Sequence, residues 1–149
     1  MYFETSVDIK ASADIVWATL IDIAHWPETT PSITRATLLT DAPLALGSRA
    51  QIKQPGIPEL VWEVTEFHPG SGFTWRASSP GVTTVGGHAL RIDANRVVLT
   101  LSLRQTGVLS AIVGWLTGAR TRRYVQMEAE GLKRRCESAS VGTEHVAPV

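Results

Sequence analysis

Apolar and polar residues alternate along residues 2–9 and 33–105, which is the pattern of strands with one buried face. In the first such segment, Tyr2 to Ile9, the side chains of Phe3, Thr5 and Val7 share a face with Ile9. The same alternation predicts further strands over Ile33–Thr40, Gly47–Gln54, Leu60–His68, Gly72–Ser78, Thr83–Asp93 and Arg96–Gln105. Several of the connecting turns are rich in Pro and Gly, and they are too short for the crossover that parallel strands require. We therefore expect an antiparallel sheet of about seven strands.

Two segments follow the spacing of an α-helix instead. Ser12 is placed to cap the start of a short helix, which Pro27 should end. After Gly107, a period of about 3.6 residues continues to Glu137 and predicts a helix roughly 43 Å long. We expect its buried stripe to contain Leu109, Val113, Leu116, Arg120, Tyr124 and Met127.

The order strand, helix, six strands, long helix predicts an α+β fold. One face of the antiparallel sheet has to be covered, and only the C-terminal helix is large enough to cover it. Because a strongly twisted sheet seldom packs flush along one helix, we expect a mostly apolar cavity between the two, of the kind that small molecules occupy. We assign residues 1–137 to this single domain and expect residues 138–149, which lack periodicity, to form a flexible tail.

The amino-acid composition and charge balance limit the kinds of molecule that the protein is expected to bind. Of 149 residues, 44% are apolar and 19% are charged, as in ordinary globular domains, and fourteen basic side chains balance fourteen acidic ones. A protein built to bind phosphate backbones normally has a basic excess, so we expect no nucleic acid as a partner. The longest strongly apolar stretch, Val108 to Trp115, is far shorter than the ~18–20 residues of a membrane span, and the first residues show no secretory signal. We therefore expect a cytoplasmic protein without stable membrane insertion, whose oligomeric state the sequence leaves open.

The charges are unevenly spread along the chain. Residues 1–70 carry four basic against nine acidic side chains, whereas residues 71–149 carry ten against five. Most of the basic excess lies between Arg120 and Arg135. We interpret it as a solvated helix face rather than a membrane-binding one, which would need more net charge and fewer acidic neighbours. The sequence has no Gly-rich phosphate loop, no nucleophile elbow, and no metal-binding spacing of His with its single cysteine, Cys136. We expect no metal and no cofactor.

Several stretches of the chain resemble a known superfamily. They are Ser12–Trp17, Asp22–Ile33, Leu46–Arg49 and Trp62–Phe67 leading into Phe73–Trp75. Together with the helix after Gly107, they are similar to the START/polyketide cyclase/Bet v 1-like superfamily (SRPBCC, the helix-grip domains), and the resemblance covers about residues 1–137. It implies a curved sheet wrapped around the C-terminal helix, short helices after the first strand, and a hydrophobic pocket for ligands that range from lipids and sterols to polyketides. It implies no single chemistry, because some members cyclise or dehydrate polyketides and others only carry or sense ligands.

His88 is the candidate catalytic residue. Alternation places it with Leu90 on the apolar face, where an imidazole that faces the cavity could act as a general base or donate a hydrogen bond to a ligand carbonyl. The alternative is a core histidine bonded to a backbone carbonyl. A carboxylate from Glu66, which shares the inward parity of Trp62, would complete an acid–base pair, although an exposed strand end is the simpler interpretation.

The other candidates would line the cavity. Trp62 and Trp75 form aromatic walls or plain core, and Arg120 either meets a ligand oxygen or extends to solvent. Tyr124 offers its hydroxyl to the ligand or fills the core. The predicted ligand-binding residues are Trp62, Trp75, His88, Leu90, Leu101, Leu116, Arg120 and Tyr124.

We therefore expect a binding or carrier protein for a small hydrophobic ligand of polyketide, lipid or aromatic type. The alternative is a cofactor-independent polyketide cyclase or dehydratase that uses His88 as its general base. Which of the two applies, and so whether the protein is an enzyme, stays open at this point.

Overall fold

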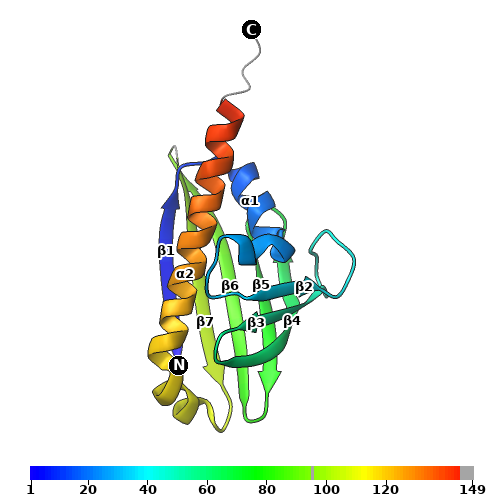
Figure 1. Cartoon of the computed structure of the whole chain (residues 1–149), viewed down its shortest axis with the longest axis vertical. Coiled ribbons are helices and arrows are strands. Elements are labelled where there is room, and N and C mark those ends of the chain that lie inside the picture. Colours follow the sequence, from blue (N-terminus) through cyan, green and yellow to red (C-terminus); the bar gives the residue numbers. More distant parts are fainter. Residues whose placement is uncertain (95, 145–149) are drawn as a thin grey trace.

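In residues 1–94 and 96–144, which the computed structural model describes, seven strands form one antiparallel sheet (Figure 1). Across the sheet the order is β1-β7-β6-β5-β4-β3-β2. The first strand, β1, pairs with the last strand, β7, and all other pairs join strands that are consecutive in the sequence. The strands are β1 (Tyr2–Ile9), β2 (Arg35–Leu38), β3 (Arg49–Gln54), β4 (Ile57–His68), β5 (Gly72–Ser79), β6 (Val82–Asp93) and β7 (Arg96–Thr106). The predicted antiparallel sheet is confirmed.

The strand bounds differ from the predicted ones by a few residues, and the largest shift has a local cause. β4 begins at Ile57 rather than at Leu60. Gly56 adopts φ +73°, a left-handed conformation that glycine enters without strain, so Pro55 and Gly56 alone make the turn from β3.

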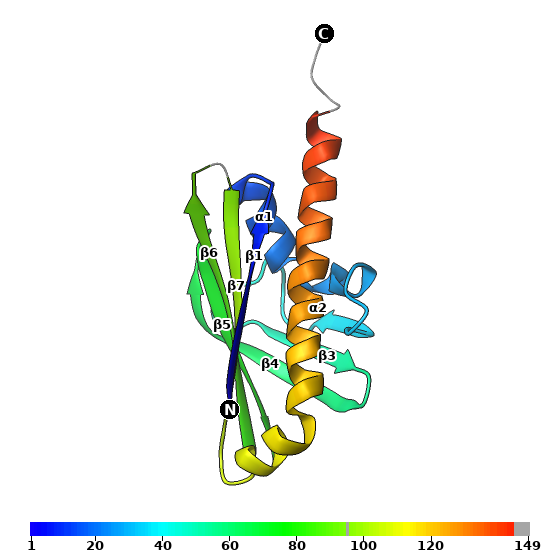
Figure 2. The same cartoon turned by 90° about the vertical axis from the view of Figure 1, so that its left-hand side faces the viewer.

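The sheet curves around one long helix, α2 (Ser110–Glu144). Figure 2 shows β1, β6 and β7 on one side of α2 and β2 and β3 on the other. The pairing register shifts between Val64 and Glu66 of β4 and again between Ile52 and Gln54 of β3, and such irregularities bend strands. The helix-grip architecture is therefore confirmed.

Two short helices connect β1 to β2. The first, α1 (Ala13–Ile21), begins at the predicted cap, where Ser12 Oγ accepts a hydrogen bond from the backbone N–H of Ile15 at 3.2 Å. The chain then continues as the 3-10 helix η1 (Ile23–Glu28). This helix carries Trp26 into the interior, where only 1% of the residue is exposed.

The long helix extends further than predicted. It continues past residue 137 to residue 144, so residues 138–144 are helical where a tail was expected. Residues 145–149 of the expected tail lie outside the described residues. The division of the chain into a domain of residues 1–137 and a tail stays a prediction.

The helix also buries a different face from the predicted one. Leu116 and Arg120 are exposed, so the predicted stripe is wrong at these positions. The residues that α2 buries are Gly118, Val125, Ala129, Gly131, Leu132 and Cys136. Gly131 allows this face to approach the residue after η1 closely, because a Cβ on Gly131 would lie 2.6 Å from the carbonyl oxygen of Thr29.

The core lies between α2, the two short helices and the concave face of the sheet. Its largest fully buried side chains include Trp26, Phe73, Leu20, Leu99 and Leu132. In the described part of the chain, no helix combines the length and the apolar character needed to cross a membrane.

Candidate ligand-binding site

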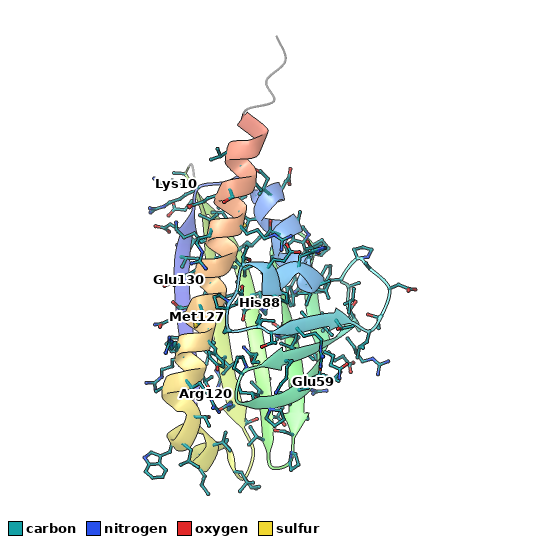
Figure 3. The ribbon with its side chains drawn as sticks, in the orientation of Figure 1. Lys10, Glu59, His88, Arg120, Met127 and Glu130 are labelled. Atoms are coloured by element: carbon teal, nitrogen blue, oxygen red, sulfur yellow. The ribbon has the colours of Figure 1, made fainter. Side chains whose placement is uncertain are left out.

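His88 lies on the concave face of the sheet, paired with Phe73 of β5 on one side and Leu101 of β7 on the other. The residue is buried, and its ring stacks on Phe73 with centroids 4.3 Å apart and planes 15° apart. Figure 3 shows His88 beside the middle of α2. The structure thus places this side chain inward, as the alternation predicts, while its catalytic role stays a prediction.

Two tryptophans contact the imidazole, and a third packs on one of them. The ring centroids of Trp26 and Trp75 lie 5.7 Å and 5.4 Å from that of His88, and Trp62 lies 5.3 Å from Trp75. Gly86 makes room for this packing, because a Cβ there would lie 2.8 Å from Trp75 Nε1. Trp62 and Trp75 therefore belong to the packed core and also line the space beside His88.

The long helix α2 places a carboxylate next to His88 and its aromatic neighbours. Glu128 Oε1 lies 3.1 Å from His88 Nε2, with the two side chains 16% and 4% exposed. A neutral imidazole that donates from Nε2 to this carboxylate keeps Nδ1 as a hydrogen-bond acceptor. That Nδ1 is buried and has no hydrogen-bond partner among the described residues. The carboxylate that pairs with His88 is thus Glu128 and not Glu66, which is exposed on β4.

A cavity of about 70 Å³ lies between α2 and the sheet beside this pair. One water molecule occupies roughly 30 Å³ of liquid, and a cavity of about 150 Å³ is known to admit benzene. The cavity therefore fits about two waters or one end of a larger ligand, because the tryptophans fill much of the expected hollow. Its lining includes Trp26, Trp62, Trp75, His88, Leu101, Tyr124, Val125 and Glu128.

A groove of about 500 Å³ adjoins the cavity along the N-terminal half of α2. Ile57 and Thr121 line both spaces and so mark their junction. Arg120 lines the groove but not the cavity, and its guanidinium reaches towards the turn between β3 and β4. A Cβ on Gly56 of that turn would lie 2.6 Å from Arg120 Nη1. In Figure 3, Arg120 lies closer to the start of α2 than the position where His88 faces the helix. Arg120 therefore lies at the mouth of the groove.

Tyr124 ties the helix to the same turn. Its hydroxyl donates a hydrogen bond to the carbonyl oxygen of Pro55 at 2.7 Å, and the residue lines the cavity. This hydroxyl is engaged by the backbone, so the contribution of Tyr124 to the site is a wall that also holds α2 over the groove.

Two of the predicted site residues lie elsewhere. Leu90 packs against the core, paired with Leu99 of β7, and does not line the cavity. Leu116 is exposed on the first turns of α2 and lines neither space. Leu101, in contrast, lines the cavity as expected.

The sequence interpretation left Trp26 out of the predicted ligand-binding residues and missed Glu128 as the partner of His88. A signal for Glu128 is present, since it follows Tyr124 by four residues and precedes Leu132 by four, which places it on the buried side of the helix. For Trp26 there was only its position at the end of the first helical segment, where the depth of burial depends on tertiary packing.

A charged corner fixes η1 against α2 close to the site. The carboxylate of Asp22 lies 2.7 Å from His25 Nδ1 and raises the pKa of His25 above its ordinary value. Arg135 of α2 donates to the same carboxylate at 3.0 Å and to the carbonyl oxygen of His25 at 2.8 Å. Because Trp26 is the next residue along η1, these bonds also fix one wall of the cavity.

Comparisons with known proteins agree with this architecture. The sequence model of the family described as "Polyketide cyclase / dehydrase and lipid transport" matches residues 2–137. The search of curated protein sequences gave no match.

Similar solved structures come from several bacteria. A hypothetical protein from Helicobacter pylori superimposes with a TM-score of 0.79 at 18% identity, over 91% of this chain and 88% of that one. A START superfamily protein from Mycobacterium smegmatis gives 0.67 at 12% identity, over 95% and 98%. The di-domain ARO/CYC StfQ from the steffimycin biosynthetic pathway gives 0.70 at 16% identity, over 97% of this chain and 52% of StfQ. At these identities, the likeness shows the fold.

Proposed function

This chain belongs to the polyketide cyclase/dehydrase and lipid-transport family of the START/Bet v 1-like superfamily, and from that premise we propose that it binds a small, mostly hydrophobic molecule between α2 and the sheet, as a binding or carrier protein. The observation that carries the proposal is the adjacency of the groove and the cavity, which meet at Ile57 and Thr121. A ligand that enters along the groove would place one end against the tryptophans and His88.

The shape of the two spaces sets the character of the ligand. The cavity is too small for a whole lipid or polyketide, so most of such a molecule would lie in the groove and only its tip would enter the cavity. The tip would meet flat aromatic walls, and next to these walls lie two buried polar groups, the indole N–H of Trp26 and Nδ1 of His88, neither of which has a hydrogen-bond partner among the described residues. A planar ring that bears a hydroxyl group fits both features, because a hydroxyl can accept from an indole N–H and donate to an imidazole nitrogen.

Binding can be tested with a plug at the junction of the two spaces. Thr121→Phe should block passage from the groove to the cavity, whereas Gln126→Phe adds the same ring to an exposed position of the same helix. Anthraquinone and palmitate serve as aromatic and aliphatic probes, and quenching of tryptophan fluorescence reports on occupancy. We expect saturable binding to the unmodified protein and to Gln126→Phe, and at least tenfold weaker binding to Thr121→Phe, since the ring removes apolar contact worth more than about 1.4 kcal/mol. Equal affinities in all three proteins would contradict the proposed site.

The second candidate is a cyclase or dehydratase, and the His88–Glu128 pair is the observation in its favour. The unpartnered ring nitrogen of His88 would take a proton from a methylene group between two carbonyls, and Glu128 would stabilise the imidazolium that forms. The carbanion would then attack a second carbonyl carbon of the same chain, forming a carbon–carbon bond, and the resulting alkoxide would take up the proton. Loss of water would follow. StfQ carries the name ARO/CYC, which makes a polyketone the substrate class to try.

Turnover separates the two functions. A cyclisable linear polyketone should be bound without change by a carrier and consumed by an enzyme. In the enzyme case, His88→Ala should abolish turnover while Glu128→Gln lowers it, because the amide keeps a hydrogen-bond partner but loses the charge. Unchanged turnover in His88→Ala would remove this residue from the mechanism.

A further inference from the structure

The first turns of α2 expose an apolar surface that the core does not use. Five large hydrophobic residues are exposed there: two in the turn just before α2, and three on its first turns, where Ile112 is three residues from Trp115 and four from Leu116, so that these three share one side of the helix. Trp115, the largest, is 84% exposed. We call this set the apolar end; it consists of Val108, Leu109, Ile112, Trp115 and Leu116.

The surface that continues from the apolar end is basic. The spacing of Ile112, Leu116, Arg120 and Arg123 keeps them on one side of the helix, so the apolar turns pass directly into a basic one. Arg122 adds a third charge next to them. Between residues 94 and 127 the sequence has no acidic side chain at all, and the acidic residue of the nearby groove, Glu59, already pairs with Arg35 at 2.9 Å.

The apolar end adjoins the mouth of the groove. Val113 and Arg120, on the same turns of α2, line the groove, and the backbone N–H of Leu109 donates to the carbonyl oxygen of Gly81 in the turn between β5 and β6 at 3.0 Å. Figure 1 shows this yellow start of α2 at the same end of the molecule as the N-terminus. The exposed apolar side chains, the arginines and the groove opening are thus on one end of the protein.

We infer that this end docks on the surface of an anionic lipid bilayer, with the apolar end inserted among the headgroups and the arginines against the lipid charges. A tryptophan with aliphatic neighbours followed by arginines is the composition of helices that lie in the membrane interface. The segment is too short to span the bilayer, and interfacial binding requires no span. The solvated face expected from the sequence is thus one part of a membrane-binding surface. This inference goes beyond the proposed binding function and stands without it.

A second copy of the chain is the weaker candidate for the same surface. A two-fold contact through the apolar end would bring Arg120, Arg122 and Arg123 of both copies together, and like charges repel. Five side chains are also few beside the roughly 20–30 residues per partner in a standard interface. Anionic lipid headgroups satisfy both the apolar and the basic part of the surface.

Cosedimentation with vesicles tests the inference. The unmodified chain should bind vesicles of equal parts phosphatidylcholine and phosphatidylglycerol, bind pure phosphatidylcholine much more weakly, and dissociate as salt is raised. Leu116→Ser should weaken binding about tenfold, because it removes one inserted aliphatic side chain. Arg122→Gln should weaken it about fivefold at low salt.

Matched control variants distinguish binding through this surface from non-specific binding of the protein to vesicles. Leu46 is 68% exposed, as is Leu116, but lies in the loop between β2 and β3, so Leu46→Ser should leave binding unchanged. Arg76→Gln, on an exposed position of β5, is the equivalent control for charge. Equal binding to neutral and anionic vesicles, equal losses in the Leu46 and Leu116 variants, or a dimer in sedimentation that Leu116→Ser dissociates would each overturn the inference.

Discussion

Removal of the Glu128 carboxylate should destabilise the protein mainly by leaving His88 unpaired. In Glu128→Met the helix keeps a side chain of similar length, but the only hydrogen bond to the imidazole that the described residues provide is lost. Since the His88 side chain is only 4% exposed, bulk solvent does not reach it to replace that partner. A buried polar group without a partner costs about 1–3 kcal/mol. We expect the free energy of unfolding to fall by about 2 kcal/mol, which corresponds to a decrease in Tm of about 4–8 °C for a chain of this length.

A double-mutant cycle isolates the interaction from other effects of the substitutions. His88→Phe places an apolar ring among aromatic neighbours, so the double variant with Glu128→Met has no unpaired imidazole. Urea unfolding, followed by tryptophan fluorescence, should show that the double variant loses at least about 1 kcal/mol less than the sum of the single variants. The exposed pair of Arg35 and Glu59, at 2.9 Å, serves as the control and should give a coupling below about 1 kcal/mol. Additive losses for His88 and Glu128 would refute the idea that the carboxylate is needed to satisfy the imidazole.

Two further predictions concern the contacts that position α2. Gly131→Ala should lower the free energy of unfolding by about 1–3 kcal/mol, because the new methyl group would lie 2.6 Å from the carbonyl oxygen of Thr29. Gly118→Ala, with its nearest neighbour a methionine sulfur at 3.6 Å, should raise it by up to about 1 kcal/mol through helix propensity, and urea unfolding of both variants checks the opposite signs. Asp22 raises the pKa of His25 above 6.5, so the stabilisation from their bond is present below that value and is lost as the pH rises through the folded-state pKa. NMR titration should show the His25 pKa falling towards 6.5 in Asp22→Asn.

The sheet could be predicted from the sequence because its signal is local. Alternation along β1, β6 and β7 depends only on which side chains face the core, and the short turns leave antiparallel pairing as the remaining arrangement. The same alternation was enough to place His88 and Trp75 on the inner face. The start of β4 was misjudged because two prolines suggested a longer turn than Gly56 requires.

The size of the cavity could not be predicted in this way. Its volume is what remains after three tryptophans have packed, and their positions depend on contacts between distant segments. Trp75 needs the missing side chain of Gly86 on the neighbouring strand, and Trp26 is held by the bonds between η1 and Arg135. A small rotation of any of these rings would change the volume of the cavity, so a pattern along one strand carries no information on it.

The candidate site depends on which face α2 turns towards the sheet. The stability effects of substituting two leucines of this helix report on that orientation. Sequence spacing favoured a buried face through Leu116, whereas the structure exposes Leu116 and buries Leu132 to 1%. Leu132→Ala should therefore lower the free energy of unfolding by about 2–5 kcal/mol, and Leu116→Ala should change it by less than about 0.5 kcal/mol. Both variants remove the same atoms from the same helix, so propensity differences cancel between them. If the larger loss came from Leu116, the helix would be turned towards the face that the sequence favoured, and Glu128 would not reach His88.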